Sequence, residues 1–366
     1  MTIRTKAVLK SYYNTGDTPS EANFADWIDM VPPEPFALYV AASDAEAREI
    51  ASADYVCDGT DDDVQIIAAI AAAAAGGGRV VLSSGNFNLV NKLDLSGLII
   101  SIEGQGRYIT NLNFVLGASG ECITLSRTVS LTARATLKGF GIIGDNTNSA
   151  IGIFLTGGAT GAAHNSIEDI YIYRCVDAIH GDSGNSQNLF VRILTRDCAD
   201  GFWMDGVSNT YIGCIVSMAG GVLSAGIGFH STEQNSAYFS CASEYHEVGY
   251  NIGAYAVGTS YFGCVTEKTG HAIQIGGTAP DQPVGITFSG GGHYTMQDAT
   301  DSVIIVNTSI STSFLGVAVM TSTSGKSMLI SGVGAVDTMV LGGYYPETVA
   351  DAGTTTTFLP ATIEHA

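Results

Sequence analysis

Short apolar segments recur at a regular interval in the second half of the chain, and each follows a small residue. Five of them repeat with a nearly constant spacing: Ala178-Ile179, Gly201-Phe202, Gly226-Ile227, Gly249-Tyr250 and Ala272-Ile273. A second apolar column precedes them, formed by Ile170, Ile193, Cys214, Cys241 and Cys264. The three cysteines end near-copies of one tetrapeptide, Tyr211-Ile212-Gly213-Cys214, Tyr238-Phe239-Ser240-Cys241 and Tyr261-Phe262-Gly263-Cys264. Weaker copies with a slightly longer spacing follow at Phe288, Leu315 and Leu341.

A period of roughly two dozen residues with short strands predicts a solenoid, in which each coil buries its inward residues against the next. Leucine-rich repeats need a lattice of leucines and α-solenoids need helical periodicity, and the repeats have neither. We therefore predict an all-β fold in which residues 79–366 form a right-handed single-stranded parallel β-helix. Equivalent residues of successive coils then stack about 4.8 Å apart. Cys214, Cys241 and Cys264 become an interior ladder of structural thiols.

Residues 1–35 lack the repeats and are predicted to contain one short helix. Thr18-Pro19-Ser20-Glu21 is a capping box with proline at the first helical position, which predicts a short helix through Trp27 and Ile28. The proline-rich stretch Val31–Pro35 ends this helix and forms a stiff linker. Because so short a segment buries little surface by itself, we expect residues 1–35 to dock on another subunit or protein.

Residues 36–78 are predicted to form a helical cap that leads into the solenoid. Helices are expected over residues 44–51 and 64–75. Thr60 is the predicted N-cap of the second helix, with Asp61-Asp62-Asp63 at the positive end of its dipole. Gly76-Gly77-Gly78 ends this helix, and the first long strand begins at Arg79.

Composition narrows the class of partner. The 366-residue chain has 35 acidic and 15 basic residues, a formal net charge of −20, which disfavours nucleic acid or an anionic membrane as partner. An anionic substrate would need a local basic patch or a bridging cation. No run of apolar residues is long enough to span a membrane, and the N-terminus has no apolar region typical of a signal peptide. The seven cysteines form no metal-ligand spacing, so we expect free thiols.

Two resemblances add a family context. Ala53–Asp62, Ile66–Ala72, Gly76–Phe87 and Ile102–Gly106 resemble the opening of pectate-lyase-superfamily β-helix proteins, in which a helix caps the N-terminal end of the solenoid. That superfamily includes lyases, hydrolases, epimerases and non-catalytic spikes, so the resemblance indicates the fold more than the chemistry. Tyr13–Ser20 and Phe24–Asp29 are similar to N-terminal segments of bacteriophage tail and tail-fibre proteins.

Together these resemblances imply a tailspike-like protein located in a virion or outside the cell. Such a protein would be a homotrimer that binds or degrades a host cell-surface glycan, with its N-terminal segment docked on a virion or tail component. The chain departs from that pattern at one point, because no obvious trimerisation domain follows the repeats.

Aligning the repeats collects titratable residues on one ridge. Three residues past the Ile170 column lie Tyr173, Arg196, Ser217, Glu244, Glu267 and His293. The adjoining column contains Arg174, Asp197, Met218, Tyr245, Lys268 and Tyr294. Because neighbouring coils are about 5 Å apart, Glu244 and Glu267 are candidates for the carboxylate pair of a glycoside hydrolase. One of two such close carboxyls is expected to have a raised pKa and to serve as the acid.

The remaining ridge residues have proposed roles around this pair. His293 is a third catalytic candidate, and Arg196, Asp197, Tyr245, Lys268 and Tyr294 are candidates for substrate binding. Tyr245, Lys268 and Tyr294 would equally suit a lyase, with Lys268 or Arg196 neutralising a uronate carboxylate. The ridge could also be a solvated face without chemistry.

Exposed aromatic rings can stack on the apolar faces of sugars. Trp203, Tyr245, Tyr250, Tyr261 and Tyr294 are candidates. Phe202 and Tyr250 fall in an inward column, which favours core packing for both. Trp203 should point outward and is the main candidate.

A second polar column contains Asp182, Asp205 and His230, with Glu233 nearby. These residues could be acid–base groups, a Ca²⁺ site or turn formers. No calcium loop is recognisable, so we predict no metal site and no cofactor, with Ca²⁺ left as an open alternative. The function favoured by the sequence is binding and depolymerisation of a polysaccharide, by hydrolysis rather than elimination. A non-catalytic adhesive tail protein and a uronate lyase or epimerase are the alternatives.

Overall fold

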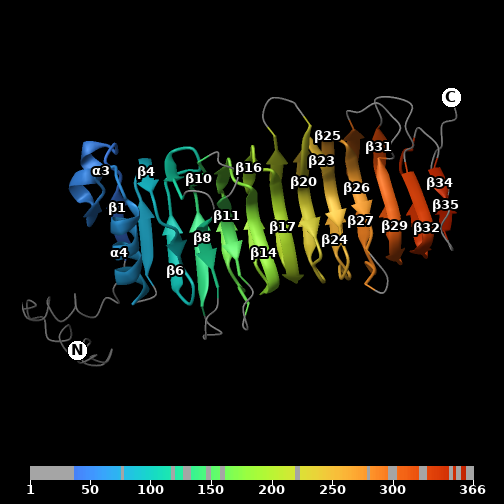
Figure 1. Cartoon of the computed structure of the whole chain (residues 1–366), viewed down its shortest axis with the longest axis horizontal. Coiled ribbons are helices and arrows are strands. Elements are labelled where there is room, and N and C mark those ends of the chain that lie inside the picture. Colours follow the sequence, from blue (N-terminus) through green and yellow to red (C-terminus); the bar gives the residue numbers. More distant parts are fainter. Residues whose placement is uncertain are drawn as a thin grey trace, which may run out of the picture.

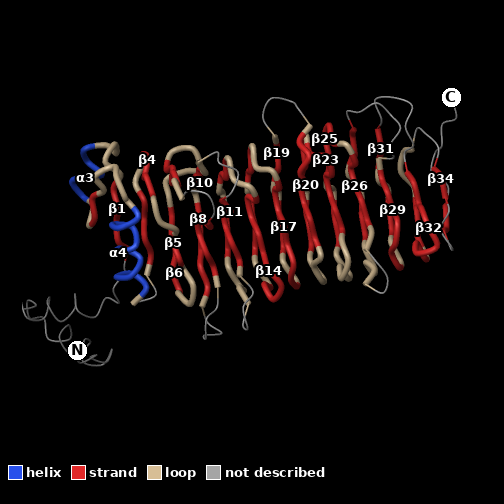
Figure 2. The backbone as a smooth tube through the Cα atoms, viewed as in Figure 1, coloured by secondary structure: helices blue, strands red, loops and turns tan. Residues whose placement is uncertain are grey.

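The computed structural model describes residues 37–75, 78–116, 120–126, 133–145, 150–156, 161–218, 223–277, 281–295, 303–320, 328–345, 349–351 and 356–359. Over these ranges the chain is an elongated solenoid with strands side by side along its length and helices at its N-terminal end (Figure 1). Strand accounts for nearly all the regular structure (Figure 2). The predicted parallel β-helix is confirmed. The helix predicted within residues 1–35 lies outside the described residues, and the division into three segments stays a prediction.

Each coil contributes strands to three parallel sheets, which we name A, B and C. Sheet A has 14 strands in the spatial order β2 (Tyr55–Val56), β1 (Ala37–Ala41), β3 (Arg79–Leu82), β6 (Ile99–Glu103), β9 (Arg134–Lys138), β12 (Ser166–Glu168), β15 (Leu189–Val191), β18 (Thr210–Ile212), β21 (Ala237–Phe239), β24 (Ser260–Phe262), β27 (Thr287–Ser289), β30 (Ser313–Leu315), β33 (Thr338–Leu341) and β35 (Thr356–Leu359).

The other two sheets follow the same order along the axis. Sheet B contains β4 (Gly85–Leu89), β7 (Thr110–Phe114), β10 (Gly141–Ile143), β13 (Tyr171–Tyr173), β16 (Leu194–Arg196), β19 (Ile215–Ser217), β22 (Ala242–Glu244), β25 (Val265–Thr269), β28 (Gly292–Thr295) and β31 (Ala318–Met320). Sheet C contains β5 (Leu93–Asp94), β8 (Gly120–Leu125), β11 (Ala150–Leu155), β14 (Asp177–Ser186), β17 (Asp200–Val207), β20 (Ser224–Ser231), β23 (His246–Ile252), β26 (His271–Ile275), β29 (Ile304–Ile310), β32 (Met328–Val336) and β34 (Val349–Asp351).

The interior is built from stacks of like residues. Cys214, Cys241 and Cys264 are buried in consecutive coils as free thiols, which confirms the predicted ladder. Tyr211, Tyr238 and Tyr261 stack face to face beside them, with ring centroids 4.1 and 4.6 Å apart. Such pairs add about 0.5–1.5 kcal/mol each to the gain from burial alone. Tyr261, considered above as a sugar-stacking residue, therefore belongs to the core, as does Tyr250.

Insertions between strands displace the predicted alignment in one coil. Ile227 was aligned with Phe202 and Tyr250, but the residue that pairs with both in sheet C is Phe229. The rings of Phe202, Phe229 and Tyr250 stack at 5.1 Å spacings. The register shifts between Ser224 and Ile227, where an irregularity lengthens this coil. An alignment that assumes a constant repeat length cannot detect this register shift.

The cap combines two helices with two short strands. The helices are α3 (Ala47–Ser52) and α4 (Asp63–Ala74), close to the predicted ranges. Helix α4 lies at the N-terminal end of the solenoid (Figure 1). Its buried apolar residues are Ile66, Ala69, Ile70 and Ala73. Strand β1 pairs with β3 and with β2, so sheet A extends beneath the helices.

The start of α4 differs from the prediction. Asp62, not Thr60, is the N-cap residue, and its side chain caps no helical N–H. The Asp62 carboxylate instead accepts hydrogen bonds from the backbone N–H groups of Gly59 and Asn88, at 2.9 and 2.8 Å. Asp63 likewise accepts from the N–H of Val90. These buried aspartates join the cap to the first coil, which supports a structural rather than metal-binding role.

Candidate functional site

The predicted carboxylate pair lies on the outer face of sheet B. Glu244 and Glu267 are direct partners in adjacent strands β22 and β25, as the repeat alignment predicted. Arg196 lies two coils away in the same column, through Ser217. The Glu267 side chain is 55% exposed and its carboxylate lies 3.5 Å from Lys268 Nζ. The predicted column is therefore present on sheet B, with Glu267 exposed to solvent and Glu244 half-buried.

Tyr245 follows the end of β22, and Lys268 lies within β25 where its register with β28 shifts. Both adopt a left-handed backbone conformation, with φ of 62° and 56°, and Asp197 takes the same conformation at φ 53° in its own coil. Lys268 Nζ donates to Tyr245 Oη at 2.8 Å and lies 5.0 Å from the ring centroid. The hydrogen bond with Tyr245 raises the pKa of Lys268. The predicted contact between neighbouring coils at Tyr245 and Lys268 is therefore confirmed.

His293 is wrongly placed by the repeat alignment. It pairs with Thr266 rather than Glu267, and Tyr294 takes the position beside Glu267. A slip of one residue in a strand moves a side chain to the opposite face. His293 is consequently buried in the core, with 0% of its surface exposed. The backbone of Tyr294 is in β28, while its side chain lies outside the described part of the chain.

Trp203 points outward, as expected, but on sheet C and away from the ridge. It stacks on the rings of His180 and His230 from the coils on either side, at 6.4 and 4.0 Å between centroids. The three residues are direct register partners in β14, β17 and β20. Asn251 of the next coil continues the column, with its Nδ2 3.2 Å from His230 Nδ1.

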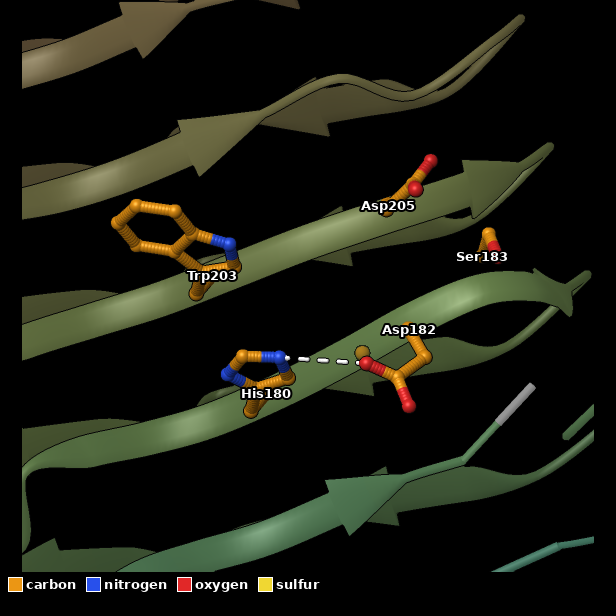
Figure 3. Close-up of a pocket in the computed structure, with 6 residues that line it drawn as sticks. His180, Asp182, Ser183, Trp203 and Asp205 are labelled. Carbon is orange, nitrogen blue, oxygen red and sulfur yellow. Dashed lines mark ion pairs between the residues drawn. The ribbon is translucent and has the colours of Figure 1, made fainter. Parts of the chain in front are cut away.

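A groove of about 460 Å³ opens beside these rings. It is lined by His180, Gly181, Asp182, Ser183, Trp203 and Asp205 (Figure 3). Asp182 and Asp205 come from adjacent coils, with Ser183 next to them, at the end of the groove away from the Trp203 ring (Figure 3). The groove therefore combines aromatic rings at one end with two carboxyl groups at the other.

His180 is held between two carboxylates. Its Nδ1 lies 2.7 Å from Asp177 Oδ2, and its Nε2 lies 3.4 Å from Asp182 Oδ1. The hydrogen bond with Asp177 raises the pKa of His180, which favours the imidazolium. Burial has the opposite effect on His230, whose pKa falls to about 4. The Trp203 ring therefore lies between one histidine that favours its charged form and one that stays neutral at pH 7.

Burial perturbs two carboxyl groups at and beside the groove. It raises the pKa of Asp205, and the charge of nearby Asp182 raises that pKa further. Burial also raises the pKa of Asp200, although its carboxylate accepts a 2.6 Å hydrogen bond from the Ile227 N–H. Acid and base roles arise where neighbouring carboxyl groups differ in environment, and the raised pKa of Asp205 favours the acid role for that residue.

An irregularity in β14 presents Asp182 and Ser183 to the groove. The register between β14 and β17 shifts between Gly181 and Asn185, so residues 182–184 bulge opposite Asp205. The buried side chain of Asn185 closes this bulge, because its Nδ2 donates to the carbonyl oxygens of Asp182 and Asp205. The Asn185 Oδ1 in turn accepts from Asn209 Nδ2 at 2.8 Å. Both aspartates are thus positioned by the interior of the solenoid.

Glu233 belongs to that interior and not to the polar column. It is 0% exposed. Its carboxylate accepts hydrogen bonds from Tyr211 Oη at 2.8 Å, Tyr238 Oη at 2.6 Å and Asn209 Nδ2 at 2.6 Å. Burial raises its pKa despite these donors.

Comparison with known proteins supports the fold. No family model matches the sequence, and no curated protein matches it. Among solved structures, ORF18 of Geobacillus virus E2 matches over 94% of this chain and 66% of its own, less than two thirds of its length, with 14% identity and a TM-score of 0.54. The A-module of mannuronan C-5 epimerase AlgE6 from Azotobacter vinelandii matches over 84% of this chain and 97% of its own, with 14% identity and a TM-score of 0.51.

A looser match is the catalytic unit of a GH87 α-1,3-glucanase from Streptomyces thermodiastaticus, with 15% identity over 83% of this chain and 68% of its own and a TM-score of 0.45. The two matches with TM-scores above 0.5 show that the chain shares its parallel β-helix fold with a phage protein and a mannuronan epimerase module. At such identities the likeness concerns the fold alone.

The sequence contains a signal for the groove that alignment of the ridge misses. Asp177, His180 and Asp182 recur one coil later, at the same spacing, as Asp200, Trp203 and Asp205. Asp182 and Asp205 were identified as a polar column, but the roles of His180, Asp177, Asp200 and Ser183 were not predicted. Because residues one period apart stack on adjacent coils, this repeated pattern predicts that both sets of side chains lie on the same outer face of the solenoid.

Neither a metal cluster nor a spanning helix is present in the described ranges. Within them, no group of three or more histidine, cysteine, aspartate or glutamate side chains is arranged to hold a metal ion. In the same part of the chain, none of the helices is both long and apolar enough to span a membrane.

Proposed function

We propose that the groove on sheet C binds a polysaccharide and that Asp182 and Asp205 hydrolyse one of its glycosidic bonds. The observation that carries this proposal is that two carboxyl groups from adjacent coils lie in one groove with a half-buried tryptophan ring, at the opposite end from it (Figure 3). A sugar ring can stack on Trp203 through its apolar C–H face while the groove carboxyls lie near the next linkage. The carbohydrate enzymes among the structural neighbours agree with this substrate class.

The proposed roles follow from the two environments. Asp205, whose pKa is raised, donates its proton to the glycosidic oxygen as the leaving group departs. The Asp182 carboxylate, 3.4 Å from the His180 imidazole, acts on the anomeric centre directly or by deprotonating the attacking water. In either case one water molecule is consumed, and the new hydroxyl group appears at the reducing end of one product.

Mutagenesis can test the groove against the ridge. The variant Asp182→Asn/Asp205→Asn should lose at least about 100-fold in product formation on a polysaccharide panel, since each group contributes to acid–base catalysis. The matched variant Glu244→Gln/Glu267→Gln makes the same carboxyl-to-amide changes on sheet B and should retain activity. Loss in the second variant alone would return the site to the ridge.

His180 supports a second candidate, a lyase or epimerase acting on uronates. An imidazolium held by Asp177 would neutralise the sugar carboxylate and favour removal of the neighbouring proton. Unsaturated products that absorb in the ultraviolet would identify elimination, whereas hydrolysis gives new reducing ends without such absorbance. Glycan binding without any product would favour the non-catalytic adhesive alternative. A tailspike-like role, a trimer, virion attachment and a location in the virion or outside the cell remain proposals that rest on the sequence resemblance.

A further inference from the structure

A second surface with the properties of a sugar-binding site lies at the edge between sheets A and B. A hollow of about 410 Å³ is lined there by the turns of successive coils, including Glu103, Arg107, Lys138 and Asp169. The turn containing Arg107 also carries Tyr108, which is 60% exposed. The hollow and the tyrosine thus share one turn, on a different face from the sheet C groove.

The acidic residues of the hollow already have partners. Glu103 pairs with Arg79 at 3.4 Å, and Asp169 is bound by Arg192 through two hydrogen bonds of 2.6 Å. The guanidinium of Arg192 holds the pKa of Asp169 below its usual range. The charge of Arg107 also acts on Asp169, and the Arg107 Nη1 donates to the carbonyl oxygen of Arg192 at 3.3 Å. Lys138 pairs with Glu168 at 3.8 Å, so the hollow and its ion-pair partners contain four cations, Arg79, Arg107, Lys138 and Arg192, against three acids. In a chain of net charge −20, this local excess of one cation suits an anion.

Three tyrosine rings extend the surface from the hollow across sheet B. Tyr108 and Tyr171 have ring centroids 5.2 Å apart, and Tyr171 and Tyr173 stack at 5.9 Å with planes 15° apart. The coil between Asn111 and Tyr171 carries Gly141 at this position. A Cβ at Gly141 would lie 3.0 Å from the Arg107 carbonyl oxygen, so the glycine lets the turn that carries Tyr108 approach β10 closely.

Cations flank this aromatic row at both ends. The Arg107 guanidinium lies 5.2 Å from the Tyr108 ring centroid, and that of Arg174 lies 4.6 Å from the Tyr173 ring centroid. Arg196 is the direct partner of Tyr173 on the next coil. Burial raises the pKa of Tyr171 to about 12.

We propose that the Tyr108–Tyr171–Tyr173 row and the adjoining hollow bind a polysaccharide whose sugars carry carboxylate groups. Tyrosine faces stack on sugar rings, and guanidinium groups recognise carboxylates with paired hydrogen bonds. A neutral glycan would use the rings alone, whereas an acidic glycan also satisfies the arginines. This surface goes beyond the proposed hydrolytic groove and would hold a long chain while the groove acts elsewhere on it.

Binding to defined polyuronates tests this assignment. Affinity electrophoresis and calorimetry with alginate and polygalacturonate, and with dextran as the neutral polymer, should show binding of the wild type to at least one polyuronate. That binding should weaken with added salt. The variant Tyr108→Ala/Arg107→Gln should bind about tenfold or more weakly. The control Tyr255→Ala/Arg134→Gln removes the same residue types at exposed positions elsewhere and should bind like the wild type.

The outcomes separate this site from the proposed function. No affinity for either polyuronate, equal affinity for dextran, or unchanged affinity in Tyr108→Ala/Arg107→Gln would overturn the second site. The Asp182→Asn/Asp205→Asn variant should still bind polyuronates through the tyrosine row. If the wild type binds a polyuronate through the tyrosine row but cleaves no polysaccharide, the hydrolytic proposal alone fails. If the wild type cleaves a polysaccharide but the tyrosine row contributes no affinity, the second site alone fails.

Discussion

Acid is expected to destabilise the solenoid through histidines enclosed in its core, and His293 is the best defined of them. Its Nδ1 lies 3.3 Å from Thr266 Oγ1, and its Nε2 has no hydrogen-bond partner among the described residues. Rings of Tyr250 and Phe288 flank it, each at 6.4 Å between centroids. Removing the charged form from water lowers the pKa of His293 to about 4, from an ordinary value of 6.5.

The sign and size of the effect follow from these two values. A folded-state pKa below the unfolded value means that the unfolded chain binds the proton first as the pH falls. The stability is fully present above pH 6.5 and is lost progressively as the pH falls toward about 4. At about 1.4 kcal/mol for each unit of the pKa difference, the total loss from this residue is about 3.5 kcal/mol.

The variant His293→Leu isolates this contribution. Leucine has a similar volume and no titratable group, so near pH 7.5 its unfolding free energy should lie within about 1.5 kcal/mol of the wild type. Between about pH 7.5 and 4.5 it should lose about 2–3 kcal/mol less than the wild type does. Urea denaturation followed by circular dichroism at both pH values measures this difference.

An exposed histidine provides the control. His164→Asn keeps a residue that tolerates the left-handed backbone of that position, φ 59°, and should leave the pH dependence of stability as in the wild type. Equal loss of stability in the wild type and His293→Leu would refute the reasoning, since the imidazole would then be hydrated or partnered in solution.

Further predictions concern the interior network, one ion pair and the thiols. Because burial raises the pKa of Glu233, the stability that its protonated form contributes is lost as the pH rises above 4.5, and Glu233→Gln should flatten that fall in unfolding free energy. Tyr238→Phe removes a 2.6 Å hydrogen bond to that carboxylate and should cost about 1.5–3 kcal/mol in urea denaturation. Arg192→Ala breaks an exposed pair with Asp169 and should change the melting midpoint by the equivalent of less than about 1 kcal/mol. A hydrogen bond with Cys214 and burial raise the pKa of Cys241, so it should react with an aromatic disulfide reagent only after unfolding, and fast labelling of the native protein would contradict this.

Periodicity was sufficient to predict the solenoid, because a β-helix repeats the same inward residues in every coil. The cysteine and tyrosine ladders and the pairing of Glu244 with Glu267 all follow from that repetition. These neighbours are predictable since the backbone spacing between coils is fixed by hydrogen bonding.

Positions near insertions depended on the tertiary structure. His293 moved inward and Phe229 replaced Ile227 because the coils differ in length, and the length of a turn is not encoded in the apolar pattern. The groove also depends on the tertiary structure. The bulge at residues 182–184 brings Asp182 opposite Asp205, and the buried Asn185 side chain holds the backbone carbonyl groups of both aspartates. The sequence alone determined which residues repeat, whereas the packed coils decided which of them share a face, because one added residue in a strand reverses the direction of every side chain that follows.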